Sequence, residues 1–248
     1  ACRGTDDRTR LMVLDLSGGG WRTVVSGKGW RSSPRFLPGD DRLLYTGGDL
    51  LDLPQRGLRP YGHGPAIADI ATGAETILPI GTPGFFMVFG PQLGPGPAIY
   101  FSAMNPRSAT LRKMLTGRGV DLGQFPILVW RVPVAGPALT AIGPMELAED
   151  IFRVDRNGVS QLTIVDDGRL IVFEIVDFRA VDGKVEQFLA LEKGVVREVA
   201  RTRTLVRMFS LSEDGATGLI LGDPQRTSRA GAVNDFFLVD MANGDIRP

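Results

Sequence analysis

LMVLDLSGG (residues 11–19), AIADIATG (residues 66–73) and FLVDMANG (residues 237–244) share one spelling: an apolar run, an aspartate, an apolar residue, two further residues and a glycine. Two looser copies, LVWRVPVAG (residues 128–136) and FLALEKG (residues 188–194), hold the same place in the order of the chain. Each copy predicts a strand, a tight turn and a second strand. Self-similarity at a spacing of roughly 50 to 60 residues indicates an array of like units that pack side by side.

A second type of strand pair lies between these copies, at residues 33–48, 85–103, 160–175 and 207–222. Each pair is an apolar strand, a Gly/Asp/Pro turn and another strand, which is the signature of a β-hairpin. Two hairpins in sequence make a four-stranded antiparallel meander, and radial repetition of such sheets makes a β-propeller. We therefore predict an all-β propeller of about five four-stranded blades, a single domain over residues 1–248.

With the strands of a blade lettered a to d, the repeated segments are predicted to be third strands, at residues 11–16, 66–70, 128–132, 188–191 and 237–241. The first copy has no a–b hairpin before it, and the sequence stops soon after the last copy. We expect the ring to be incomplete at the termini or to have a degenerate final blade. The aspartates at Asp15, Asp69 and Asp240 are expected to accept hydrogen bonds from the turns that follow them.

The a–b hairpins carry a Pro or Ser before the strand, then Asp/Gly and a basic residue at the turn. This pattern resembles the WD-like repeats of TolB-type propellers, and the resemblance covers about three quarters of the chain by the extent of the repeats. It implies a protein-binding platform without a catalytic motif. The residues that carry it are Ser33, Pro34, Pro38, Gly39, Asp40, Asp41 and Arg42 in the first copy, and Asp166, Asp167, Gly168 and Arg169 in the third.

Composition restricts the function further. The 28 basic residues equal the 28 acidic ones, which argues against a nucleic-acid binder. A single cysteine, Cys2, and a single histidine, His63, argue against a Cys/His zinc site. Cys2 follows Ala1 as in a bacterial lipoprotein cleavage signal, which predicts an extracytoplasmic, membrane-anchored protein. The alternative is an inert thiol in a flexible N-terminal segment, residues 1–9.

Catalytic chemistry finds little support in the sequence. There is no G-x-S-x-G motif, and His63 lies in a Gly/Pro-rich stretch. VDRNG at residues 154–158 lacks the glutamate of a calcium loop, so no metal and no cofactor are predicted. The alternatives are a carbohydrate-active hydrolase or lyase and the propeller domain of a larger peptidase. Carboxylate candidates for the first are Asp40, Asp41, Asp166, Asp167, Glu146, Glu149 and Asp150, whereas Trp21, Trp30 and Trp130 are assigned to core packing.

The connections between strands b and c are longer than the hairpin turns, at residues 46–64, 105–125, 177–185 and 222–234. Elaboration of one face predicts a working surface that binds a protein partner. The longest connection, residues 105–125, is predicted to hold a short helix at residues 109–116, capped by Ser108. The predicted contact residues are Arg56, Arg59, Arg107, Leu111, Arg112, Lys113, Met114, Leu115, Arg118, Arg226 and Arg229.

Overall fold

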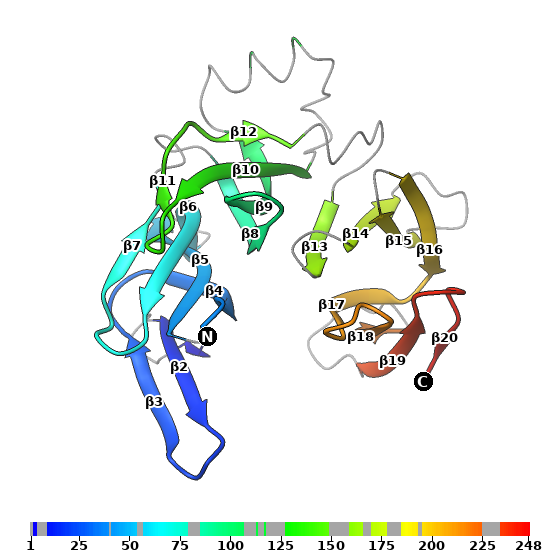
Figure 1. Cartoon of the computed structure of the whole chain (residues 1–248), viewed down its shortest axis with the longest axis horizontal. Helices are drawn as coiled ribbons and strands as arrows, with labels where there is room; N and C mark the ends of the chain where they lie inside the picture. The colour runs from blue at the N-terminus through cyan, green and yellow to red at the C-terminus, as the bar shows by residue number, and fades with distance from the viewer. Residues whose placement is uncertain are drawn as a thin grey trace. The chain divides into compact units, whose positions relative to one another are not determined.

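The computed structural model describes residues 2–3, 9–39, 41–53, 57–78, 85–106, 113, 117, 127–148, 159–165, 170–177, 185–192, 195–224 and 234–248. The chain divides into two compact units, one built from residues 1–93 and 97–147 and the other from residues 94–96 and 148–248. Each unit is a series of antiparallel sheets (Figure 1).

The first unit holds three sheets, each followed in the chain by the next. The first sheet has the order β1 (Cys2–Arg3), β2 (Thr9–Asp15), β3 (Gly20–Val25). The second has the order β4 (Trp30–Phe36), β5 (Arg42–Leu53), β6 (Gly57–Asp69), β7 (Glu75–Ile77). The third runs through β8 (Phe85–Gly94), β9 (Ala98–Pro106), β10 (Ile127–Ala135) and β11 (Thr140–Ala141), and β12 (Glu146–Leu147) also pairs with β10.

The second unit holds two four-stranded sheets of the same order. One is β13 (Val159–Val165), β14 (Leu170–Asp177), β15 (Val185–Glu192), β16 (Val195–Thr202). The other is β17 (Leu205–Leu211), β18 (Thr217–Asp223), β19 (Asp235–Asp240), β20 (Ile246–Arg247). Apart from β12, which pairs with β10, strands adjacent in sequence are adjacent in every sheet, so each sheet is a meander.

All the predicted hairpins are confirmed. Four of the repeated segments form the third strands of their sheets, which are β6, β10, β15 and β19. The remaining segment forms β2, which pairs with β3 in the way that a third strand pairs with a fourth. β1 pairs with β2 through Cys2 opposite Arg10 and Arg3 opposite Thr9. Two residues of the segment that we expected to be flexible are thus part of a sheet edge.

The motif aspartates act as predicted at the turns. Asp15 Oδ1 accepts from the Ser17 N–H at 2.9 Å, Asp69 Oδ1 from the Thr72 N–H at 2.7 Å, and Asp240 Oδ1 from the Ala242 N–H at 2.9 Å. The serine and threonine bonds lower the pKa of Asp15 and of Asp69. Each aspartate therefore stabilises the turn that its own strand enters.

The looser copy at residues 128–136 differs from the prediction in the register of its turn. Ala135 pairs with Thr140, so the turn is formed by residues 136–139. The last residue of this turn is Leu139, with a φ of 51°. The corresponding residue is Gly73 (φ 72°) in the β6–β7 turn and Gly244 (φ 79°) in the β19–β20 turn. Gly136, which the sequence aligned with those glycines, stands three residues earlier at the start of its turn.

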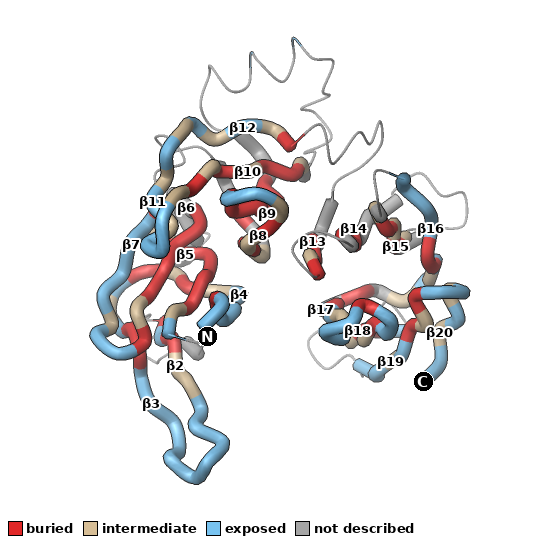
Figure 2. The backbone as a smooth tube through the Cα atoms, in the orientation of Figure 1, coloured by how far each residue is buried: buried red, intermediate tan, exposed pale blue. Residues whose placement is uncertain are grey.

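Each sheet has two faces, which we call upstream (toward the sheet earlier in the chain) and downstream (toward the next sheet). In β6, Ala66 and Ala68 pack upstream in a cluster with Leu11 of β2, whereas Ile67 packs downstream in a cluster with Ile99 and Trp130. Alternate side chains of a strand point to opposite faces, which explains this division. Figure 2 shows buried backbone in the middle of these sheets and exposed backbone at the β2–β3 turn.

Besides the apolar cluster around Leu11, an arginine and a glycine at the β6–β7 turn hold the β1–β3 and β4–β7 sheets together. Arg22 Nη1 in β3 donates to the carbonyl oxygen of Ile70 at 2.6 Å, in the next sheet's β6–β7 turn. In the same turn, a Cβ added to Gly73 would lie 2.5 Å from the carbonyl oxygen of Val24. A glycine is therefore needed at position 73 for two reasons: its backbone is left-handed, and the carbonyl oxygen of Val24 in β3 lies where a side chain would be.

We call such a contact between neighbouring sheets a joint. The second unit repeats it at the equivalent residues. Arg197 Nη2 in β16 donates to the carbonyl oxygen of Met241 at 2.9 Å, in the β19–β20 turn. A Cβ on Gly244 would lie 1.9 Å from the carbonyl oxygen of Val199. Val24 and Val199 each follow their arginine by two residues, so the two joints have the same construction.

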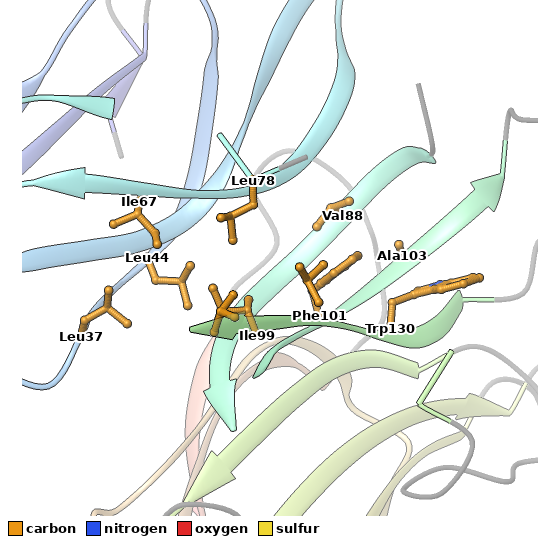
Figure 3. Close-up of a cluster of buried hydrophobic side chains, with 11 residues drawn as sticks. Leu37, Leu44, Ile67, Leu78, Val88, Ile99, Phe101, Ala103 and Trp130 are labelled. Carbon is orange, nitrogen blue, oxygen red and sulfur yellow. The ribbon is translucent and has the colours of Figure 1, made fainter. Parts of the chain in front are cut away.

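The joint between the β4–β7 and β8–β11 sheets is apolar. Leu44, Ile67, Leu78, Ile99, Phe101 and Trp130 all belong to one buried cluster there (Figure 3). Thr76 of β7 stands where the other joints have Arg22 and Arg197, and among the described residues nothing lies within 4 Å of a Cβ added to Gly136. Arg42 donates instead to the carbonyl oxygen of Pro137, across the same two sheets.

Candidate functional site

The b–c connection of the β4–β7 sheet is a two-stranded ribbon. β5 and β6 pair beyond the limits of their sheet, from Asp49 opposite Tyr61 to Leu53 opposite Gly57. β4 pairs with β5 only as far as Gly48, and β7 pairs with β6 only over residues 66–68. In the part of the chain that the structure describes, residues 49–53 and 57–61 therefore have each other as their only strand partners.

This ribbon corrects the prediction of a long loop at residues 46–64. The Gly/Pro content of TGGDLLDLPQRGLRPYGHG suggested irregular structure. The glycines instead accommodate a register shift between Gly47 and Asp49. Pro60 lies in a ribbon whose edges pair with no other described strand, where a residue without an N–H is tolerated. Thr46 and Gly47 are buried sheet residues.

The connection predicted at residues 105–125 lies between β9, which ends at Pro106, and β10, which begins at Ile127. The last two b–c connections begin and end within a residue or two of the prediction. β14 ends at Asp177 opposite Val185 of β15, and β18 pairs Gly222 with Asp235 of β19. Antiparallel order places these connections at the same end of their sheets as the ribbon.

Most of the predicted contact residues lie outside the described residues: Arg56, Arg107, Leu111, Arg112, Met114, Leu115, Arg118, Arg226 and Arg229. The backbone of Arg59 lies in β6, opposite Leu51, and so belongs to the ribbon. Lys113 is exposed. The helix at residues 109–116 stays a prediction, because Lys113 is its one described residue.

A polar cluster joins four strands of the first unit. Arg31 of β4 forms a bidentate ion pair with Glu75 of β7, with Nε–Oε2 at 2.9 Å and Nη2–Oε1 at 2.7 Å. Tyr45 of β5 donates its hydroxyl to the same carboxylate, and Arg31 Nη1 donates to the carbonyl oxygen of Thr9 in β2 at 3.1 Å. Arg31 Nη1 also donates to the carbonyl oxygen of Gly27 at 3.3 Å, so each nitrogen of this buried guanidinium has an acceptor, as buried charge requires.

The protonation of this cluster is held in one state. Burial raises the pKa of Glu75, but the hydrogen bonds from Arg31 and Tyr45 outweigh burial and leave it below its ordinary value. Burial, followed by the bond to Glu75, raises the pKa of Tyr45, and Glu75 raises that of Arg31. Glu75 is therefore a fixed carboxylate and Tyr45 a fixed phenol at neutral pH, which suits a structural role better than proton transfer.

The carboxylate candidates for glycoside chemistry do not gather among the described residues. Glu146 lies in β12, where its Oε1 is 3.3 Å from Arg131 Nε. Asp41 lies at the β4–β5 turn beside Arg42, with 3.4 Å between Oδ1 and Nε. Asp40, Glu149, Asp150, Asp166 and Asp167 lie outside the described residues. Within the described ranges no three His, Cys, Asp or Glu side chains group as a metal site, and no helix is long and apolar enough to span a membrane.

Core packing does not account for all three tryptophans. Trp130 is fully buried in β10, and Trp30 is half-buried in β4. Trp21 in β3 is 66% exposed, opposite Leu14 of β2, which is also exposed. The strand pattern correctly placed Trp21 on a strand, but it did not show that the Trp21 side chain is exposed.

No protein-family model and no curated protein match this sequence. Solved structures do: TolB from Acinetobacter baumannii has a TM-score of 0.58 at 16% identity, covering 96% of this chain and 47% of its own. A putative TolB from Agrobacterium tumefaciens has a TM-score of 0.59 at 12% identity, covering 96% of this chain and 68% of its own. An oligogalacturonate lyase in complex with manganese has a TM-score of 0.57 at 13% identity, covering 96% of this chain and 58% of its own.

The meandering four-stranded sheets and these matches define the class of fold, a β-propeller. More particularly, the chain has the fold of the TolB-like propellers, as its WD-like repeats implied. It spans about half the length of the first of these structures, 47%. Since a TolB and a lyase both have this fold, the fold alone does not assign an activity.

Proposed function

We propose that this protein is a non-catalytic propeller that binds another protein through its b–c face. The observation that carries the proposal is the ribbon at residues 49–53 and 57–61, which extends beyond the β4–β7 sheet with both edges unpaired among the described residues. An isolated two-stranded ribbon is marginally stable in water. Its unpaired N–H and C=O groups are ready to pair with an added strand from a partner.

The charge of the connections on this face complements the proposal. Residues 105–125 contain the basic residues Arg107, Arg112, Lys113 and Arg118 and a single acidic residue, Asp121. Arginine pairs with carboxylates in a bidentate way, so an acidic partner segment fits this surface. Charge at the rim of an interface controls association more than dissociation. Charge reversal at Arg112 and Lys113 should therefore slow association and change its salt dependence.

The alternative is the enzymatic one, a lyase or peptidase on the same fold. The oligogalacturonate lyase on this fold is a complex with manganese. In the described ranges of this chain, Glu146 is paired with Arg131 and Glu75 with Arg31, which favours a structural role for both carboxylates. We assign the alternative second place for that reason.

Cross-linking from defined positions tests the proposal. A photoreactive residue at position 51 or 59 of the ribbon should capture the partner in cells of the native source, whereas one at Glu213, in the β17–β18 turn at the opposite end of its sheet, should not. Replacing residues 49–61 by an Asn-Gly turn should abolish capture from position 113 while the melting temperature is retained. Capture confined to the short hairpin turns would overturn the proposal.

We also propose an extracytoplasmic location with a lipid on Cys2. The sequence context of Cys2 and the TolB-like fold support this location. Mass spectrometry of the protein from its native membrane tests it: a diacylglyceryl adduct on Cys2 is expected, and an unmodified thiol would exclude it.

A further inference from the structure

The β19–β20 turn ends with a dipeptide that is prone to deamidation. Asn243 and Gly244 are its last two residues, and the equivalent residues of the β6–β7 turn are Thr72 and Gly73. Asparagine is one of the chemically labile residues of proteins. It reacts most readily before glycine, because a glycine has no side chain to hinder its backbone nitrogen. Asn243 is exposed, so water can reach its amide.

Deamidation at this pair is a reaction of the chain with itself and then with water. The backbone nitrogen of Gly244 attacks Cγ of Asn243, and Nδ2 leaves as ammonia, taking up the proton of that backbone N–H. The product is a five-membered succinimide ring, which water opens at either of its two carbonyl carbons. Opening at Cγ leaves an aspartate, whereas opening at the backbone carbonyl carbon leaves an isoaspartate, whose main chain runs through Cβ and Cγ. Either product carries one more negative charge than asparagine.

The folded turn holds both reacting groups in hydrogen bonds. The Gly244 N–H donates to the carbonyl oxygen of Asp240 at 2.7 Å. The Asp245 N–H donates to Oδ1 of Asn243 at 2.9 Å, which restrains the side-chain amide. The ring can close only after the Asn243–Gly244 peptide group turns and directs its nitrogen at Cγ, and that rotation breaks the bond to Asp240. The folded turn therefore opposes the reaction.

The contact with β16 keeps the turn in this form, and both elements belong to the second unit. Arg197 Nη2 donates to the carbonyl oxygen of Met241 at 2.9 Å, and Met241 is 3% exposed at the start of the turn. A Cβ added to Gly244 would lie 1.9 Å from the carbonyl oxygen of Val199, so the backbone of β16 is packed directly against Gly244. The Asn243–Gly244 peptide group therefore has no room to turn while β16 is in place.

We propose that Asn243 is a deamidation site controlled by the joint between β16 and the β19–β20 turn. While the joint is closed, residue 243 remains an asparagine. When the joint opens, the turn is released and Asn243 is converted to aspartate and isoaspartate. The conversion is irreversible, because the ammonia is lost to the solvent. This modification is independent of the ribbon and of the partner proposed above.

The product works against closure of the joint. Isoaspartate adds one carbon to the main chain before Gly244, so Gly244 no longer meets the carbonyl oxygens of Asp240 and Val199 in register. Its carboxylate also stands between Asp240 and Asp245 in the sequence, and repulsion among like charges destabilises the turn. Each opening of the joint is thus recorded in the covalent structure of the chain.

Peptide mapping by mass spectrometry tests the proposal. The unsubstituted protein is incubated at neutral pH, both folded and unfolded in guanidinium chloride, and the conversion of residue 243 is followed with time. Conversion should be slower in the folded protein by about tenfold or more, because only molecules with an open joint react. Equal rates in the folded and the unfolded protein overturn the proposal.

Arg197→Leu, studied below its melting temperature, tests whether the joint is responsible. Loss of the bond to Met241 should raise the population of the open joint, and with it the conversion of residue 243, about five- to thirtyfold. Hydrogen exchange of the Gly244 N–H should accelerate by the same factor, since both processes need the same opening. The matched control Arg22→Leu removes the equivalent bond of the first unit and should change neither rate. Conversion that is unchanged in Arg197→Leu, or that rises equally in Arg22→Leu, also overturns the proposal.

Discussion

The two joints of the first unit hold neighbouring sheets together by different means. Between the β1–β3 and β4–β7 sheets, Arg22 and Gly73 fix the contact through backbone carbonyl groups. Between the β4–β7 and β8–β11 sheets, a large apolar cluster around Phe101 and Trp130 takes over, and the arginine and the close glycine are both absent from the described residues of that joint. Both joints bury apolar side chains, but only the first also has the fourth-strand arginine and the close turn glycine. Burial of apolar area without those two residues tolerates drift in sequence.

The largest expected effect comes from Gly244→Ala. Its Cβ would lie 1.9 Å from the carbonyl oxygen of Val199, and φ is 79°. Left-handed strain and overpacking together should lower the free energy of unfolding by about 2 to 5 kcal/mol. Gly136→Ala is the matched control, since φ is 69° there without a close neighbour, and it should cost about 1 to 2 kcal/mol. Equal losses in urea unfolding would show that the close approach does not hold the joint.

The second effect concerns the polar cluster at Arg31. Arg31→Met should cost about 2 to 3 kcal/mol, less than a fully buried pair because Glu75 is partly exposed. The pKa of Glu75 is lowered in the folded state, so the stabilisation is present above its unfolded pKa of about 4.5 and is lost as the pH falls through the lower, folded value. Glu75→Gln should flatten this acid dependence in thermal unfolding. An unchanged pH profile would contradict the assignment.

A smaller effect separates the arginine joints from the apolar one. Arg197→Leu removes a charge-assisted bond to the carbonyl oxygen of Met241 and should cost about 1 to 2 kcal/mol. Arg22→Leu should cost as much, because Arg22 makes the equivalent bond. Thr76→Leu, at the same position of the apolar joint, should change stability by less than about 0.5 kcal/mol. Chemical unfolding of the three variants would contradict the comparison if Thr76→Leu cost as much as the others.

The smallest effect is expected from Asp69→Ala. The exposed turn loses the acceptor of the Thr72 N–H, so the melting temperature should fall by less than it does for Arg22→Leu. Asp69→Asn, which keeps an acceptor oxygen, is the control. Binding of the partner at the b–c face should be unaffected, and loss of binding at an unchanged melting temperature would show that Asp69 has a functional role.

Much of the fold could be predicted because it depends on short-range sequence features, the hairpin turns and the strands next to them. Hairpin turns such as IATG and MANG and the apolar strands beside them fix the third strands, and the aspartates bond within their own turns. The ribbon at residues 49–61 could not be recognised, since glycine and proline at a bulge and a free edge look the same as in a loop. Leu139 was missed because a turn can shift along the chain while its strands stay paired.

The site residues were less accessible to sequence reasoning. Burial depends on what covers a strand, so Trp21 and Trp130 cannot be told apart by their strand positions. A signal for the joint did exist: Arg22 and Arg197 stand at the same place in two fourth strands. The role of these arginines is seen only when the acceptor is known, a carbonyl oxygen of the next sheet. That acceptor lies 44 residues further along the chain for Arg197 and 48 for Arg22.

The ribbon has a consequence for how this chain can diverge. In an antiparallel ribbon that closes on a fixed turn, one residue must be added to each strand together, because a single insertion would shift every later pair by one register. Related sequences should therefore differ in the length of residues 49–61 by even numbers, with the pairing of Gly47 and Gly64 preserved. Odd differences should come with a second bulge. The contacts of the β4–β7 sheet with its neighbours would be unaffected by such changes. Natural selection can therefore change the length of the ribbon without disturbing the sheet that carries it.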